Sequence, residues 1–133
     1  MKINEFIQKY RKVKKIMPGM TTGYTPHVVC KDGFKMSVQA SSSHYCEPKT
    51  IADDYSEVEI GYPSQEESML MKYCEDEDNP CNTVYGYVPC SVIDKIIEKH
   101  GGIDEDTIIK NLKEAAWEEI QEKDCVKKEQ SNE

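Results

Sequence analysis

The sequence predicts an α+β fold: a small antiparallel sheet of about four strands, helices packed on one side, and a C-terminal helix. Three observations indicate this class. Segments in which apolar and polar residues alternate are interspersed with segments of helical spacing, in the order α-β-β-β-α-β-α. Short turn signals, above all Asp32-Gly33, separate the strands. A length of 133 residues suits one domain with an appended segment.

The chain opens with an amphipathic helix, predicted from Ile3 to Arg11. Four residues recur there at helical spacing, namely Ile3, Phe6, Ile7 and Tyr10. The following stretch, 17–26, holds two prolines and two glycines in ten residues and is expected to be a loop.

A β-hairpin comes next, because Asp32-Gly33 supplies the positive φ of a tight turn between residues that favour strands. Residues 34–38 alternate between apolar and polar, which predicts one buried and one wet face. A third strand is expected over 55–63. Its alternation places two residues inward, Val58 and Ile60, and two outward, Glu57 and Glu59.

The second half of the core is predicted to be helix, strand, helix. Ser64 and Glu67 fit a capping box, so a helix is expected after Ser64 and ends near Cys74. Residues 75–82 form an acidic turn, and 83–88 a fourth strand closed by Pro89. The next helix ends at Gly101 and buries a stripe made of Val92, Ile93, Ile96 and Ile97.

The character of the sequence changes after Ile103. A long helix is predicted from Asp104 to Lys123, on the helical spacing of Ile108, Ile109, Leu112, Ala116 and Ile120. The last ten residues are expected to be frayed. The predicted organisation is therefore a core domain at 1–103, and a C-terminal helix with a frayed tail at 104–133.

Composition predicts a cytosolic protein with reduced thiols. No apolar run approaches the roughly 18–20 residues of a membrane span, and no signal peptide follows the first lysines. In such a setting the six cysteines are expected to be free, and none of them forms a C-x-x-C pair.

The net charge of −8 hides two regions of opposite sign. Residues 1–16 carry six basic side chains against Glu5, a balance of +5, whereas residues 47–78 carry eleven acids against two lysines, a balance of −9. An acidic surface repels nucleic acid and attracts proteins that bind it. Direct nucleic-acid binding is therefore not expected. The alternative is a solvated acidic face that only keeps the protein soluble.

No pattern in the sequence predicts an enzyme, a metal site or a cofactor. Four side chains have the chemistry of zinc ligands: His27, Cys30, His44 and Cys46. The first two are three residues apart on a predicted strand and so point to opposite faces. A nucleophile pair of Cys46 and His44 has no visible orienting group, and the acidic turn lacks the spacing of a calcium loop.

Tyrosines beside the acidic residues indicate a protein-binding surface. The predicted partner-binding residues are Glu57, Glu59, Glu66, Glu67, Glu75, Asp76, Glu77, Asp78, Tyr62, Tyr85 and Tyr87. The alternative is that these tyrosines occupy strand and helix positions half in the core.

Three segments, "CKDGFKMSVQASSSHYCEPK", "YSEVEIGYPS" and "VYGYVP…IIEKHGGI", resemble a family of small proteins carried by phages and prophages of gut Firmicutes. The resemblance covers the chain from about Ile3 to Ile103. The helix beyond Ile103 is interpreted as an addition to the family's common core. It implies that the family includes, or is related to, anti-CRISPR proteins of the Cas9-inhibiting kind. The family offers no catalytic or ligand-binding residues that can be assigned to positions of this chain.

Charge and resemblance together predict a phage-encoded inhibitor of a host defence system, a Cas9-type effector among the candidates, in the host cytosol. Its acidic patch would bind a basic, nucleic-acid-binding surface. Two alternatives stay open. One is a sponge for a nucleotide immune signal, with Lys9, Tyr10, Arg11 and Lys12 as the only candidate pocket residues. The other is an accessory phage protein of structure or DNA metabolism.

Overall fold

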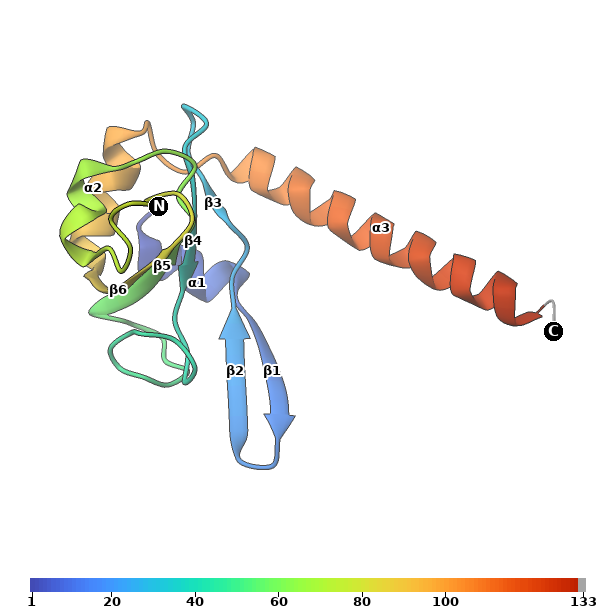
Figure 1. Cartoon of the computed structure of the whole chain (residues 1–133). Coiled ribbons are helices and arrows are strands. Elements are labelled where there is room, and N and C mark those ends of the chain that lie inside the picture. The colour runs from blue at the N-terminus through green and yellow to red at the C-terminus, as the bar shows by residue number, and fades with distance from the viewer. Residues whose placement is uncertain (132–133) are drawn as a thin grey trace.

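Two arms project from a body made of a sheet and helices (Figure 1). The computed structural model describes residues 1–131, with side chains at all of these positions except Met20 and 122–131. The body holds the four-stranded sheet and two α-helices, and the arms are a two-stranded hairpin and the C-terminal helix. The α+β class expected from the sequence is confirmed.

The main sheet is antiparallel, in the order β3-β4-β5-β6, with strands Val28–Val29, Lys35–Gln39, Glu57–Gly61 and Val84–Pro89. The predicted turn at Asp32-Gly33 joins β3 to β4, and Gly33 has a φ of 96° that other residues rarely adopt. The expected alternation holds in β4 and β5. Their inward side chains are all buried, namely Met36, Val38, Val58 and Ile60.

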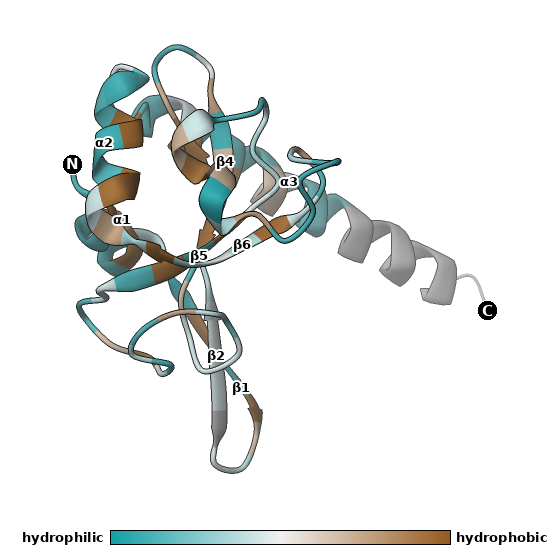
Figure 2. Cartoon of the chain, turned by 60° about the vertical axis from the view of Figure 1, so that its left-hand side comes forward, coloured by the Kyte–Doolittle hydropathy of each residue, from teal (hydrophilic) through white to brown (hydrophobic). Residues whose placement is uncertain are grey.

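Two amphipathic helices supply much of the rest of the core. Their apolar stripes turn toward the sheet (Figure 2). Helix α1, Ile3–Tyr10, buries Ile3, Phe6 and Ile7, and α2, Cys90–Lys99, buries Cys90, Ile93, Ile96 and Ile97. Since Lys2 provides no side-chain cap for α1, the carboxylate of Asp94 in α2 accepts the hydrogen bond of the Ile3 N–H at 2.8 Å. The predicted stop at Gly101 is confirmed by its φ of 91°.

The first arm is a hairpin, and its second strand lies where the sequence predicted a loop over 17–26. Strand β1, Lys12–Met17, pairs with β2, Met20–Tyr24, around a turn at Pro18-Gly19. All six residues of β1 are exposed, so no apolar face is required and no alternation marks the strand. This hairpin is called the ribbon below.

The predicted capped helix after Ser64 is wrong. Only a 3₁₀ helix forms, Ser68–Tyr73, and its N-cap is Glu67, whose side chain accepts a hydrogen bond from the Met69 N–H. Ser64 instead exchanges hydrogen bonds with the backbone of Lys35. The Ser64 hydroxyl therefore accepts from a strand distant in sequence and not from the helix that was expected to follow it.

The second arm, α3, extends over Glu105–Ser131, beyond the expected end at Lys123. Helix therefore covers most of the tail that was expected to be frayed, and residues 132–133 lie outside the described residues. Ile108 is 1% exposed and belongs to the core, so the body extends past the expected boundary at Ile103. Leu112 still packs against the core, and the C-terminal part of the helix projects from the body (Figure 1).

Candidate partner-binding surface

A β-bulge in β6 shapes the outer surface of the sheet. The register between β5 and β6 shifts between two pairs, Val58–Val88 and Ile60–Tyr85. Glu59 therefore lies opposite two residues, Gly86 and Tyr87. Tyr87 has a φ of 53°, a left-handed conformation that costs a residue with a side chain on the order of 1–3 kcal/mol. The bulge turns Tyr87 outward, 45% exposed, whereas Tyr85 stays inside.

Tyr45 lies beside Tyr87 on this surface. The Tyr87 N–H donates to the carbonyl of Tyr45 at 3.0 Å, and the two ring centroids are 5.9 Å apart. Tyr45 is itself exposed, and Lys49 lies over its ring. Sequence reasoning missed Tyr45, because it belongs to a polar connection whose path over the bulge no local pattern predicts.

The acidic residues divide into two groups. Burial raises the pKa of Glu59, although the Tyr45 N–H opposes this, and the nearby charge of Glu75 raises it further. Glu75 opens the acidic turn beside β6, where its N–H donates to the carbonyl of Val84, and Glu57 shares the outward face of β5 with Glu59. We call these three glutamates with Tyr45 and Tyr87 the bulge face.

The other predicted surface residues are placed differently. Tyr62 is 54% exposed and, like Tyr87, has a positive φ, of 50°. Four other predicted acids are exposed to solvent, namely Glu66, Asp76, Glu77 and Asp78. The Asp76 carboxylate is engaged in its own turn, where it accepts from the Asp78 N–H and from the Asn79 side chain.

Two of the predicted surface residues are buried, which corrects their assignment. Tyr85 is fully buried and its hydroxyl donates to the carbonyl of Pro80. Glu67 is 2% exposed and belongs to a polar cluster inside the body.

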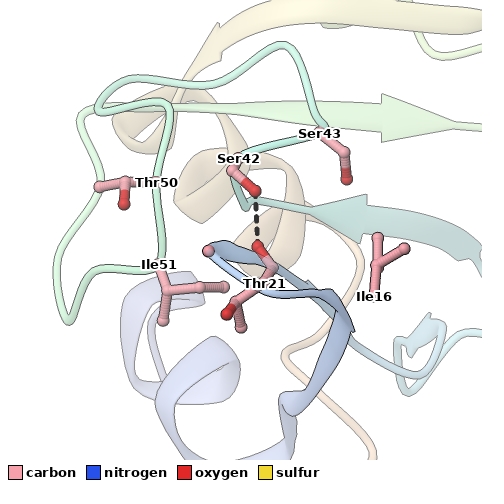
Figure 3. Close-up of a pocket in the computed structure, with 7 residues that line it drawn as sticks. Ile16, Thr21, Ser42, Ser43, Thr50 and Ile51 are labelled. Carbon is pink, nitrogen blue, oxygen red and sulfur yellow. Dashed lines mark hydrogen bonds between the residues drawn. The ribbon is translucent and has the colours of Figure 1, made fainter.

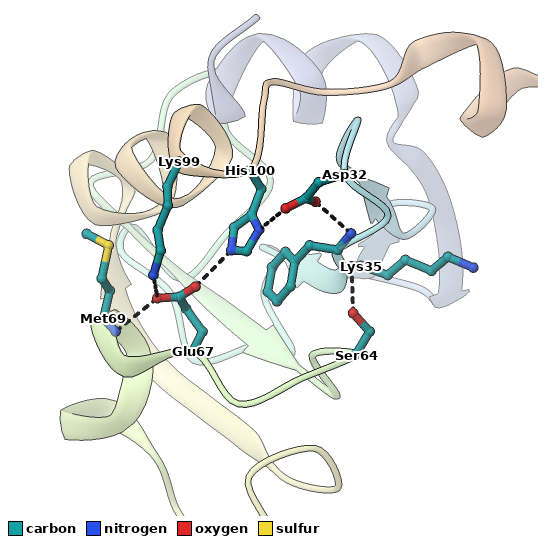
Figure 4. A network of polar contacts seen from close by, with 8 residues as sticks. Asp32, Lys35, Ser64, Glu67, Met69, Lys99 and His100 are labelled. Atoms are coloured by element: carbon teal, nitrogen blue, oxygen red, sulfur yellow. Dashed lines mark hydrogen bonds and ion pairs between the residues drawn. The ribbon is translucent and has the colours of Figure 1, made fainter.

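That cluster joins the end of α2 to two turns (Figure 4). The imidazole of His100 lies between two carboxylates, with Nδ1 2.5 Å from Asp32 Oδ2 and Nε2 2.8 Å from Glu67 Oε2. Lys99 Nζ is 2.8 Å from the other oxygen of Glu67, and the ring of Phe34 stacks on His100 with centroids 4.2 Å apart. Both ring nitrogens are occupied and the His100 side chain is 5% exposed, so the cluster ties the end of α2 to the two turns.

The charged forms of the cluster stabilise one another. Burial alone would lower the pKa of His100, but hydrogen bonds to Glu67 and Asp32 outweigh it and raise that pKa. Burial would raise the pKa of Glu67, but hydrogen bonds from Lys99 and His100 lower it. The Phe34 N–H, followed by His100, lowers the pKa of Asp32.

We expect the stability that depends on His100 to be greatest between about pH 5 and pH 6.5. A raised histidine pKa contributes stability that is complete below its unfolded value and is lost as pH rises through the folded one. The lowered carboxylate pKa values contribute stability that is lost as pH falls. The measurement is the difference in unfolding free energy between wild type and His100→Gln. Both proteins contain His44, whose pKa is lowered by burial, so the contribution of His44 to the pH dependence cancels in this difference. A difference that stays flat from about pH 5 to pH 9 would contradict the assignment.

The zinc and nucleophile candidates differ in their exposure to solvent. His27 is exposed and Cys30 buried, and burial, with Asp32, raises the pKa of Cys30 to about 11. Burial also raises the pKa of Cys46. Among the residues that the structure describes, no group of three or more His, Cys, Asp or Glu could hold a metal ion.

His44 contacts one hydroxyl group, that of Ser41. Ser41 Oγ lies 2.6 Å from His44 Nδ1, but Ser41 is fully buried, so this pair ties the loop to β2 through Thr22. A cavity of about 600 Å³ lies between the ribbon and the connection 42–51, where Ser42 donates to the carbonyl of Thr21 (Figure 3).

The four residues proposed for a nucleotide pocket do line one cavity. It measures about 330 Å³ at the root of the two arms, where Tyr24, Pro26 and Leu112 complete its wall. Several of its polar groups are already engaged. Glu105 accepts from Lys9 Nζ at 2.7 Å and from the Tyr10 hydroxyl at 2.5 Å, and Arg11 Nη1 donates to Ala52 O and Tyr55 Oη, both at 2.9 Å.

Comparisons with known protein families, curated proteins and solved structures find no match for this chain. None of the described helices combines the length and apolar character that crossing a membrane requires.

Proposed function

We propose that this protein is a phage-encoded inhibitor of a host defence complex, a Cas9-type effector among the candidates, and that it acts by binding a basic surface of that complex through the bulge face. One observation carries the proposal: Tyr87 is held outward in a strained backbone conformation, beside Tyr45 and opposite Glu59. Exposed strained residues are concentrated at functional sites, where the strain is retained for a purpose.

The chemistry of the bulge face fits a basic partner. Tyrosines provide contact area with little loss of side-chain freedom, and they dominate many protein interfaces. Glu57, Glu59 and Glu75 add negative potential around them, which speeds association with a positive surface. A partner that holds nucleic acid in a positively charged channel matches both properties.

We expect Tyr87→Gly to weaken binding by about thirtyfold, the equivalent of about 2 kcal/mol at an interface hot spot. Glycine adopts a positive φ without strain, so the stability of the variant should be unchanged or higher. The measurement pairs calorimetric titration of the effector with thermal unfolding of the inhibitor. Because binding and stability should move apart, a folding defect cannot explain the loss.

The glutamates are tested by Glu59→Lys with Glu75→Lys, at low and at physiological ionic strength. The double variant should bind more weakly and with a flatter salt dependence. The matched control, Glu5→Lys with Glu98→Lys, makes the same change in net charge at exposed positions on α1 and α2 and should bind as wild type does. Equal affinity of both double variants at both salts would contradict an acidic contact. If the wild-type protein does not bind the Cas9-type effector, that effector is not its target.

The cavity at the root of the arms favours a second candidate, sequestration of a nucleotide. Its tyrosines could stack on a base, and Lys12 could meet a phosphate. Glu105 competes for Lys9 and Tyr10, so Glu105→Gln should raise nucleotide affinity if the site is real. Calorimetry with cyclic nucleotides that gives no heat with either protein would eliminate this candidate.

A further inference from the structure

The ribbon is a basic arm with exposed apolar side chains. No acid occurs between Glu5 and Asp32, and β1 alone carries Lys12, Lys14 and Lys15, all exposed. Four large apolar side chains on the ribbon are each more than half exposed, namely Val13, Ile16, Met17 and Tyr24. Such a surface needs a partner that is both acidic and apolar.

Helix α3 has the complementary character. From Glu105 to Gln121 it carries five acids against Lys110 and Lys113, a balance of −3. Three of its exposed side chains are large and apolar, namely Ile109, Trp117 at 60% exposure, and Ile120. A helix of this length draws most of its stability from packing an apolar face, and among its described side chains Ile108 and Leu112 pack against the body.

The two arms match in reach and already meet at their root. Six residues of β1 span about 20 Å at strand spacing, and the helix from Ile109 to Ile120 spans about 18 Å. At the root, Lys9 of α1 pairs with Glu105, and Leu112 of α3 shares a cavity wall with Tyr24 of the ribbon. Beyond that point the arms diverge, so the ribbon and α3 of one chain do not pack against each other (Figures 1 and 2).

We propose that two copies of this chain associate by crossing arms, with α3 of each copy packed along the ribbon of the other. A two-fold axis makes the contact twice, so the three lysines of each ribbon lie along the net-acidic helix of the other copy. The apolar residues of ribbon and helix then cover each other. This association is independent of the bulge face and of the function proposed for it.

Trp117 makes the contact directly measurable, because it is the only tryptophan of the chain. Its fluorescence should shift to the blue as protein concentration rises, in step with a dimer mass in sedimentation. Lys12→Glu with Lys14→Glu and Lys15→Glu should weaken self-association on the order of a hundredfold, since opposed like charges cost several kcal/mol. Glu114→Lys with Glu118→Lys and Glu119→Lys should do the same.

Mixing these two triple variants is the decisive experiment. In a mixed dimer, the charge-reversed ribbon of one variant meets the charge-reversed helix of the other. The second contact joins the native ribbon to the native helix. The mixture should therefore dimerise although neither variant does so alone. The control, Lys2→Glu with Lys31→Glu and Lys95→Glu, makes the same charge change at exposed sites off the arms and should dimerise normally. A wild-type monomer, an unrescued mixture, or a tryptophan shift that is independent of concentration would overturn the proposal. So would a shift that only a host protein induces.

Discussion

Replacing His100 with alanine should lower the unfolding free energy by about 3–5 kcal/mol, the usual result when one member of a buried charge pair is removed. Glu67 would remain 1% exposed at its side chain with only Lys99 to balance its charge. Phe34 would also lose the ring stacked on it. Urea unfolding, followed by far-UV circular dichroism, measures the loss.

Lys99→Ala is the matched control, because it removes the half-exposed partner of the same carboxylate. Its loss should be about 1 kcal/mol or less, since partly solvated pairs contribute little and His100 still holds Glu67. If the two variants lost equal stability, the cluster would be organised around Lys99 and the role assigned to the imidazole would be wrong.

Ending the chain at Ile103 should cost about 2–5 kcal/mol, the range for deleting a buried isoleucine. The truncation removes Ile108, which is 1% exposed, and the hydrogen bond from the Asp104 N–H to the carbonyl of Val29. It also removes Glu105 from its place between Lys9 and Tyr10. Thermal unfolding of the truncated chain gives the measurement.

A chain that ends at Lys113 keeps Ile108 and Leu112 and loses only the projecting part of α3. It should unfold cooperatively with the midpoint of the full-length monomer, measured at a concentration where the full chain does not associate. A normal midpoint for the chain that ends at Ile103 would instead place the boundary of the core where the sequence suggested it.

Sequence patterns predicted the elements that bury one face. The Asp32-Gly33 turn, the alternation of β4 and β5, and the stripe of α2 each follow from period and turn chemistry. The ribbon escaped prediction because a strand exposed on both sides has no reason to alternate. The capping box at Ser64 failed for another reason: the Ser64 hydroxyl accepts from the Lys35 N–H, which is distant in sequence, and Glu67 itself becomes the N-cap of a shorter 3₁₀ helix.

The sequence indicated which types of residue lie near β5 and β6, but not which individual residues are exposed there. Acidic residues and tyrosines do gather near β5 and β6, yet local sequence cannot tell which of them is buried. Glu67 is drawn inside by His100, 33 positions away, and Tyr85 is separated from Tyr87 by a bulge that no period reveals. Tyr45 reaches the same face only because its loop crosses the bulge.

The way α1 is held has a consequence for the order in which the chain folds during synthesis. Its first N–H is bound by Asp94, 91 positions later, and its last turn is bound by Glu105, 96 positions from Lys9. The two ends of α1, the first helix to leave the ribosome, therefore gain these partners only after nearly the whole core has been synthesised. Such high contact order slows folding, and the nascent chain exposes Ile3, Phe6 and Ile7 until α2 has emerged.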